Sequence, residues 1–200
     1  MPTKQTDGTS ARARLLAAAG ELFYEEGVHT VGIDRVIERA GVAKATLYSA
    51  FGCKDELIRA YLKARHAATQ ERMMRGLVRF DTPRDRLIGV FEVQSLSFTD
   101  PGFRGCAFVG ASAEASSGTA VQEATADYRA WVQSLFRDLA VEAGVADPAT
   151  LARQLVILYD GAGISAWIDR DPTAAIASVS LATAVVDAAI AAGRSAGQRS

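Results

Sequence analysis

Residues 33–54, which read IDRVIERAGVAKATLYSAFGCK, carry the side chains best suited to binding another molecule. Residues 42–54 contain two lysines and no acidic residue, and their other polar side chains are hydroxylic or small. Cationic and hydroxyl groups at this spacing suit contact with phosphates, because a nucleic-acid backbone binds cations and hydrogen-bond donors. The segment therefore indicates a surface that binds nucleic acid.

The elements that must position these side chains are two short helices. Val36, Ile37 and Ala40 recur at helical spacing and predict a helix that ends at Gly41, which can adopt a positive φ. A second helix is predicted over 44–51, with Leu47 and Phe51 on its apolar face. Two short helices joined by a tight glycine turn form a helix-turn-helix, whose second helix can enter the DNA major groove.

At these positions the sequence resembles the TetR family of bacterial transcriptional regulators. The stretch AGVAKATLYSAFGCKDEL is similar to the family pattern A-G-V-[ST]-x-x-x-[LI]-Y-x-x-F-x-[ST]-K-x-x-L, with seven residues in register: Gly41, Val42, Leu47, Tyr48, Phe51, Lys54 and Leu57. The alternative is a helical hairpin in an unrelated all-α protein, since short motifs can match by chance.

The resemblance implies a set of DNA contacts. Lys44, Thr46, Tyr48 and Lys54 are expected to contact phosphates, while Ala43, Ala45 and Ser49 would face the bases. Gly32 stands where the family often has a capping threonine, and Thr30 is a nearby substitute. Small side chains make few hydrogen bonds to bases, so the operator sequence does not follow from them.

Composition excludes several other classes of protein. The 200 residues lack a Gly-rich phosphate loop and the G-x-S-x-G and H-E-x-x-H motifs, so we expect no enzyme, and no cofactor. Cys53 and Cys106 have no metal-ligand spacing, so we expect no metal site. No signal peptide precedes the first predicted helix, and we expect a cytoplasmic protein that does not associate with a membrane. Residues 1–65 carry ten Lys/Arg against eight Asp/Glu, which permits DNA binding without demonstrating it.

The periodicity along the chain predicts an all-α fold of about nine helices and no sheet. A polar arm at 1–9 is expected to be disordered, and 10–52 is expected to form the three-helix DNA-binding domain. An effector-binding and dimerisation domain is expected over 53–193, with a disordered tail at 194–200. Its helices should run from Cys53 toward Phe80, from Pro83 to Phe98, over part of 103–118, and over 120–143, 148–168 and 173–192. A mobile loop is expected within 103–118, which is rich in Gly, Ala and Ser.

The last two predicted helices indicate a homodimer. Residues 173–192 contain one charge, Asp187, and a terminal helix that is apolar on nearly all sides needs more cover than one domain offers. The family resemblance also implies dimerisation through these helices, and burial inside one subunit is the alternative. The expected dimer residues are Leu158, Gly161, Ile176, Val179, Thr183, Val186 and Ile190.

Aromatic residues gather in the central predicted helices, where the family resemblance implies an effector cavity. An ordinary packed core would also concentrate aromatic residues there. Polar residues that fall near them, including Asp160, could orient a small, largely apolar or aromatic effector. The expected effector-binding residues are Phe91, Gln94, Phe98, Phe103, Cys106, Phe108, Tyr128, Trp131 and Tyr159.

Two hypotheses of different classes therefore remain. The first is a homodimeric, ligand-responsive repressor that binds double-stranded operator DNA. The second is a helical small-molecule-binding or interaction protein with weak or no DNA binding, which Gly32, Cys53 and the modest charge make conceivable. A thiol-based sensor at Cys106 is a variant of the first hypothesis, against a cysteine that serves only as a small buried hydrophobe.

Overall fold

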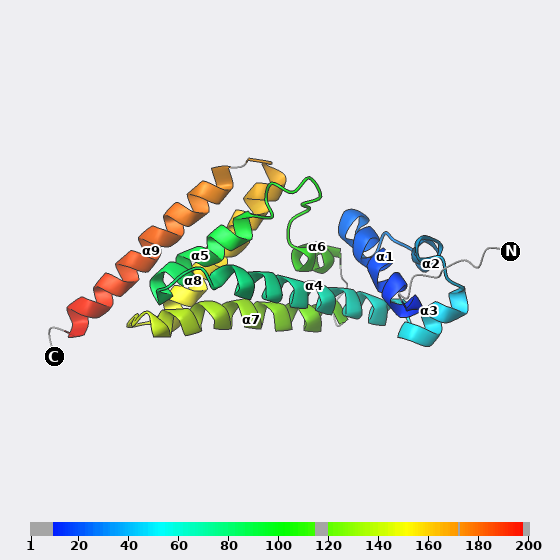
Figure 1. The fold of residues 1–200 in the computed structure, drawn as a ribbon, viewed down its shortest axis with the longest axis horizontal. Helices are drawn as coiled ribbons and strands as arrows, with labels where there is room; N and C mark the ends of the chain where they lie inside the picture. The colour runs from blue at the N-terminus through cyan, green and yellow to red at the C-terminus, as the bar shows by residue number, and fades with distance from the viewer. Residues whose placement is uncertain (1–9, 115–119, 172, 198–200) are drawn as a thin grey trace. The chain divides into compact units, whose positions relative to one another are not determined.

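The computed structural model describes residues 10–114, 120–171 and 173–197, and the side chains up to Arg194. The described residues form helices and turns without a strand, as predicted, and Figure 1 shows their order along the chain. The predicted N-terminal arm and the residues at 115–119 lie outside this range. Contacts divide the chain into two compact units, one of residues 1–65 and 107–125 and one of residues 66–106 and 126–200.

The first unit contains the predicted DNA-binding helices. They are α1 (Ala11–Glu26), α2 (Ile33–Ala40) and α3 (Lys44–Phe51), with the start of α4 (Lys54–Leu77), α6 (Ala107–Glu114) and the start of α7 (Ala120–Glu142). The Ser10 hydroxyl caps α1 by accepting a hydrogen bond from the Ala13 N–H at 3.1 Å. The apolar stripes of α1, α2 and α3 are buried together and form a core of their own.

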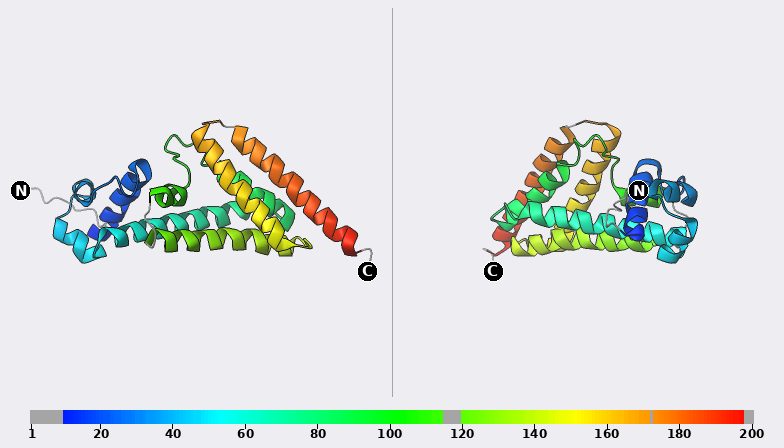
Figure 2. Two further views of the ribbon diagram at one scale, coloured as in Figure 1. Left: turned by 180° about the vertical axis from the view of Figure 1, so that it is seen from behind. Right: turned by 45° about the vertical axis from the view of Figure 1, so that its right-hand side comes forward.

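The second unit is built around α5 (Pro83–Ser95), α8 (Pro148–Ile168) and α9 (Thr173–Gly197), with the remainder of α4 and α7. These three helices pack against one another, and the left view of Figure 2 shows α8 and α9 side by side. Their starts follow from their sequences. Thr82 and Asp147 accept hydrogen bonds from the main-chain N–H three residues later, and proline occupies the first helical position in both cases. At α9, Asp171 accepts from the Thr173 N–H at 2.8 Å.

Three predicted helix ends were wrong. The fourth helix ends at Leu77 rather than near Phe80, and α5 ends at Ser95, after which Phe98 lies in a run of turns. The last helix passes through Gly193 and continues to Gly197, so the tail predicted from 194 begins too early, and 198–200 lie outside the described residues. Gly193 serves close packing instead of helix termination, because an added Cβ would lie 3.2 Å from the Gly144 carbonyl oxygen.

Candidate nucleic-acid interface

The turn between α2 and α3 is closed by backbone hydrogen bonds at a left-handed glycine. Gly41 has φ 62° and ψ 46°, and its N–H donates to the Glu38 carbonyl at 3.1 Å. The next N–H, of Val42, donates to the Ile37 carbonyl at 3.3 Å. This combination satisfies the last carbonyls of α2 and turns the chain sharply into α3, as only a residue tolerant of positive φ permits.

Buried side chains fix which face of α3 is presented to solvent. Leu47 is fully buried and Phe51 is 8% exposed, so this edge of the helix packs against α1 and α2. The opposite side carries the predicted DNA contacts: Ala43, Lys44, Ala45 and Ser49 are exposed, Thr46 is half-buried, and Tyr48 is 45% exposed. The structure therefore leaves these six predicted residues on the sides of α3 that turn away from α1 and α2, with the helix N-terminus open to an anion.

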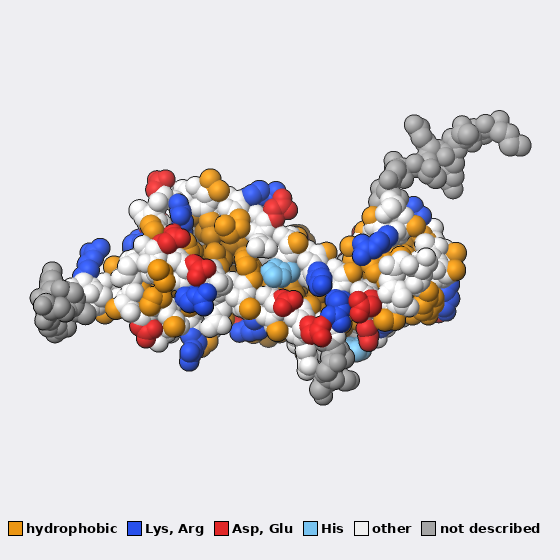
Figure 3. All heavy atoms as spheres, turned by 90° about the horizontal axis from the view of Figure 1, so that it is seen from below, with side chains coloured by type: hydrophobic (Ala, Val, Ile, Leu, Met, Phe, Trp, Pro, Cys, Tyr) orange, Lys and Arg blue, Asp and Glu red, His pale blue; other side chains and the backbone are white. Residues whose placement is uncertain are grey.

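Three basic side chains of α2 and α3 have acidic partners. Lys44 donates to Asp34 on α2 at 2.9 Å, and this hydrogen bond is the main cause that raises the pKa of Lys44. Arg39 pairs with Glu21 at 2.6 Å, and Arg35 pairs with Glu26. On the face drawn in Figure 3, Lys and Arg likewise lie close to Asp and Glu, without an extended region of one sign. Exposed pairs of this kind are weak, so phosphate can compete for the cations.

The flank of the candidate interface is the connection between α1 and α2. Thr30 and Gly32 are exposed there, and Gly32 begins α2 without a side-chain cap. The Lys54 ammonium donates to the His29 carbonyl at 3.3 Å, while the His29 N–H donates to the Glu114 carboxylate of α6 at 2.8 Å. The predicted phosphate-binding lysine is thus held at this loop, and a helix outside the predicted DNA-binding domain also contacts it. Glu114 is a residue that the sequence analysis missed, because no local pattern links it to position 29.

Comparisons with known proteins agree with this helix-turn-helix geometry. Residues 15–61 match the family model described as "Bacterial regulatory proteins, tetR family". A solved TetR-family transcriptional regulator from Streptomyces coelicolor is 33% identical, with a TM-score of 0.84 over 90% of this chain and 96% of that chain.

Two curated relatives match over less than half of this chain and of their own length. The HTH-type transcriptional activator FasR of Mycolicibacterium smegmatis is 40% identical over 82 residues, which cover 40% of this chain and 37% of FasR. The HTH-type transcriptional regulator UidR of Escherichia coli K12 is 34% identical over 83 residues, which cover 42% of this chain and 39% of UidR.

The fold and the exposed recognition helix define a helix-turn-helix DNA-binding protein. This chain belongs to the TetR family and is a TetR-family transcriptional regulator. Regulators of this family bind operator DNA and act as dimers.

The aromatic residues predicted to bind an effector do not form one cluster. Phe91 and Tyr159 pack with Phe136 at ring-centroid distances of 5.6 to 6.3 Å in the buried core of the second unit. Phe98 and Phe103 form a separate pair at 5.4 Å, and Phe108 belongs to the first unit. Asp160, expected to orient a ligand, forms an ion pair with Arg129 at 2.7 Å. Nearness of these residues in the sequence therefore did not predict which side chains contact one another.

A polar group does lie within the aromatic core of the second unit. The buried Gln94 amide donates to the Tyr159 carbonyl at 2.9 Å, and its Oε1 has no hydrogen-bond partner among the described residues. The hydroxyls of Tyr128 and Tyr159 are hydrogen-bonded to each other, and burial raises the pKa of Tyr159 to about 12. Tyr128 also packs against Trp131, at a ring-centroid distance of 5.9 Å, and half-buried Cys106 lies near both tyrosine hydroxyls. An unsatisfied amide oxygen in such a core is costly and favours a ligand that donates to it.

The residues expected at the dimer interface differ widely in exposure. Gly161 is exposed and Ile176 is 73% exposed, whereas Leu158, Val179, Thr183 and Ile190 are half-buried. The prediction for Val186 was wrong, because this side chain is fully buried within its own chain and has no surface left for a partner. Sequence reasoning also missed four exposed apolar side chains on α8 and α9: Ile157 (69%), Ile164 (40%), Ile168 (65%) and Leu181 (54%).

Proposed function

We propose that this chain is a homodimeric transcriptional repressor that leaves its operator when a small effector binds. The observation that carries the DNA-binding part is the exposed face of α3, with its open N-terminus and its hydroxyl and ammonium donors. Repression is the simplest consequence of operator occupancy that a ligand reverses, since a bound repressor blocks access to the promoter. FasR is named an activator, so the direction of regulation must be measured on this chain.

In this proposal α3 lies in the major groove. Lys44 and Thr46 contact one phosphate region at the helix N-terminus, while Tyr48 and Lys54 contact the backbone on either side. Ala43, Ala45 and Ser49 face the bases, and Thr30 and Gly32 approach the neighbouring backbone. Lys44 must then exchange Asp34 for a phosphate, which is favourable because both members of that pair are exposed to solvent.

The dimer contact is proposed on the apolar faces of α8 and α9. Ile157, Gly161, Ile164 and Ile168 follow one another at spacings of four, three and four residues, so they form a single stripe along α8. Within residues 173–194 of α9, the most apolar 18-residue stretch has a mean hydropathy of 1.9, yet only 17% of that stretch is buried within the chain. By length and composition this helix could also cross a membrane. A soluble dimer accounts for it better, because α8 presents an exposed apolar stripe beside it.

The effector response is proposed to reside in the second unit. The unsatisfied Gln94 Oε1 beside buried aromatic rings suits a largely apolar or aromatic ligand with one hydrogen-bond donor. Such a ligand lowers operator affinity only if it binds the DNA-incompetent state more tightly, and operator DNA must then weaken ligand binding by the same factor. Because α4 belongs to both units, it is the natural element to carry this coupling.

The proposed domain organisation is a DNA-binding domain at 10–52 followed by an effector-binding and dimerisation domain at 53–193. The compact units support it in outline, although they assign 53–65 and 107–125 to the first unit. We further propose that the protein acts in the cytoplasm, where a bacterial regulator meets its operator, and that it has no enzymatic activity.

Operator binding and in vitro transcription test the proposal together. A DNA fragment from upstream of the chain's own gene is titrated with protein at several salt concentrations, and transcription from it is measured. We expect salt-dependent binding of a dimer and reduced transcription. Increased transcription would replace repression by activation, and binding no stronger than to unrelated DNA would favour the alternative of a small-molecule-binding protein that has lost DNA affinity.

A further inference from the structure

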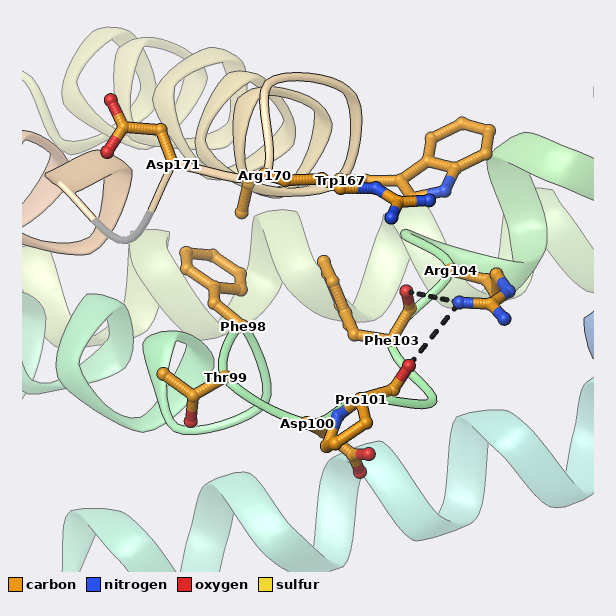
Figure 4. Close-up of a pocket in the computed structure, with 10 residues that line it drawn as sticks. Phe98, Thr99, Asp100, Pro101, Phe103, Arg104, Trp167, Arg170 and Asp171 are labelled. Carbon is orange, nitrogen blue, oxygen red and sulfur yellow. Dashed lines mark hydrogen bonds between the residues drawn. The ribbon is translucent and has the colours of Figure 1, made fainter.

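A separate pocket of about 400 Å³ lies in the second unit, between the segment that follows α5 and the C-terminal end of α8 (Figure 4). Its walls come from residues 98–104 and 166–171. A volume of this size falls within the range of small-molecule sites in proteins. Of the residues expected to bind an effector, only Phe98 and Phe103 line it, so it is distinct from the Gln94 core described above.

The apolar part of the pocket consists of three aromatic rings. Phe98 and Phe103 lie 5.4 Å apart between centroids, and the Trp167 indole is 41% exposed. Trp167 is held in place by Gly105, which has φ 78° and at which a Cβ would lie only 3.0 Å from the indole ring. A residue with a side chain would be strained by both the backbone conformation and the contact. The local sequence therefore fixes an accessible aromatic surface that suits a planar ligand.

The charged residues at the pocket are not equally available. Asp100 accepts from the Gly102 N–H at 2.8 Å, and Asp171 accepts from the N–H and the hydroxyl of Thr173 at 2.8 and 2.7 Å. In Figure 4 both carboxylates point away from the space between the rings. The Arg104 guanidinium donates to the carbonyls of Pro101 and Phe103. The two acids thus serve the local turns and do not point at the rings.

Arg170 is the charged side chain available to a ligand. It is exposed, and within the described part of the chain it makes no hydrogen bond or ion pair. Its φ of 51° lies in the left-handed region, where an arginine is strained and an asparagine or glycine is more comfortable. In Figure 4 its side chain extends along the wall toward Trp167. A planar guanidinium beside an aromatic wall matches a carboxylate carried on an aromatic ring.

We propose that this pocket binds a small planar aromatic monoanion. Its ring would lie among Phe98, Phe103 and Trp167, and its carboxylate would accept hydrogen bonds from Arg170. The regulatory consequence rests on the proposed effector response, because binding here would select one state of the second unit. Binding itself does not depend on that response and can be measured directly.

The test uses 2-naphthoate as the probe and isothermal titration calorimetry on the full chain. The neutral 2-naphthylmethanol and the non-aromatic cyclohexanecarboxylate are compared with it. The key variant is Arg170→Asn, which removes the guanidinium but suits the left-handed backbone, so the fold should be retained. We expect it to weaken 2-naphthoate binding about tenfold or more, since a charge-assisted hydrogen bond is lost. Arg170→Lys should be affected less, and Arg153→Gln, an exposed change elsewhere on α8, should have no effect.

The results separate this inference from the proposed function. Operator binding is measured on the same wild-type sample before ligand is added. If the protein binds operator but not 2-naphthoate, or binds 2-naphthylmethanol equally well, or is unaffected by Arg170→Asn, the pocket assignment is wrong and the repressor proposal stands. If 2-naphthoate binds with the expected dependence on Arg170 while the operator is not bound, the pocket assignment holds and the repressor proposal fails.

Discussion

Lys44 on the recognition helix is hydrogen-bonded to Asp34 on the preceding helix, with 2.9 Å between Nζ and Oδ1. The lysine expected to contact a phosphate therefore has a carboxylate beside it when DNA is absent. That carboxylate competes for the lysine and also repels the DNA backbone. We therefore predict that Asp34 limits operator affinity.

Asp34→Asn should strengthen operator binding, because the variant frees Lys44 and removes a negative charge from the interface. Lys44→Ala should weaken binding and lower the logarithmic salt slope by about 0.9, the value for one phosphate contact. The measurement is fluorescence anisotropy of labelled operator across a salt series. Glu38→Gln, an exposed change on α2 at a residue that forms no ion pair with a lysine among the described residues, is the control for charge alone. Equal affinities for wild type and Asp34→Asn would show that the pair does not restrain Lys44.

The turn at Gly41 should be sensitive to any side chain. An added Cβ at this position meets no atom within 4 Å, so backbone strain at φ 62° is the whole effect. Gly41→Ala should lower the free energy of unfolding by about 1 kcal/mol. Gly32→Ala is the matched control, because Gly32 has an ordinary φ of −76° and also has open space around it. Urea denaturation of both variants decides the point, and equal stabilities would rule out strain at Gly41.

The recognition helix itself can be stabilised at its first residue. Ala43 begins α3 with an extended backbone and no side-chain hydrogen bond to the first turn. Ala43→Ser would supply the missing acceptor and should raise the free energy of unfolding by about 1 kcal/mol. Ala45→Ser, inside the same helix, places a hydroxyl where no cap can form and should not stabilise the protein. A stability gain from both changes would mean that capping is not the cause.

The helix-turn-helix could be predicted from the sequence because its determinants are local. Gly41, the apolar spacing of the two helices and the position of Tyr48 all lie within one short stretch, and the structure has the two helices where they were expected. The starts of most helices in the second unit could also be predicted from local residues, since Thr82, Asp147 and Asp171 cap their own helices. Helix ends were less predictable where the deciding contact is distant, as with Gly193 against Gly144.

The partners of the core and surface side chains could not be predicted in the same way. Most residues of α9 are apolar and residues 173–192 carry a single charge, so periodicity could not distinguish the stripe that contains buried Val186 from the stripe that contains exposed Leu181. The contact between Gly105 and Trp167 joins residues far apart in the sequence, and neither residue carries a motif. Asp34 and Lys44 are separated by a turn whose geometry had to be known before their pairing could be seen.

The partial burial of His66 predicts that the stability of the fold depends on pH. Desolvation lowers the pKa of His66 below its usual 6.5 despite the opposing charge of Asp127, and its Nε2 has no hydrogen-bond partner among the described residues. The unfolded chain therefore takes up a proton at a higher pH than the folded chain. Stability should be constant above pH 7 and fall as the pH drops below the unfolded value of 6.5. Urea denaturation from pH 7.5 to 5 checks this, and His66→Gln should remove that part of the slope.

The rings that pack against His66 do not account for the predicted pH dependence. His66 packs against Tyr128 and Trp131, with ring centroids 5.6 and 5.4 Å away, and neither neighbour titrates in this pH range. His29→Gln, at an exposed position, is the matched control variant. An NMR titration in which His66 protonates at or above pH 6.5 in the folded protein would contradict the prediction.

If the dimer proposal is correct, substitutions at two positions of α9 should have different effects. Leu181 is 54% exposed in the single chain, so Leu181→Arg should leave the fold intact and place an unpaired charge in the proposed interface, which separates the subunits. Ile164→Arg should do the same from α8. Val186→Arg should instead unfold the chain, because that side chain is fully buried within it. Sedimentation velocity at micromolar concentration and thermal denaturation distinguish the two results, with Gln133→Arg on α7 as the control.

DNA affinity should fall with dissociation, since one recognition helix engages a single half-site. A wild-type chain that sediments as a monomer, or a Leu181→Arg variant that remains dimeric, would place the subunit contact elsewhere or exclude it.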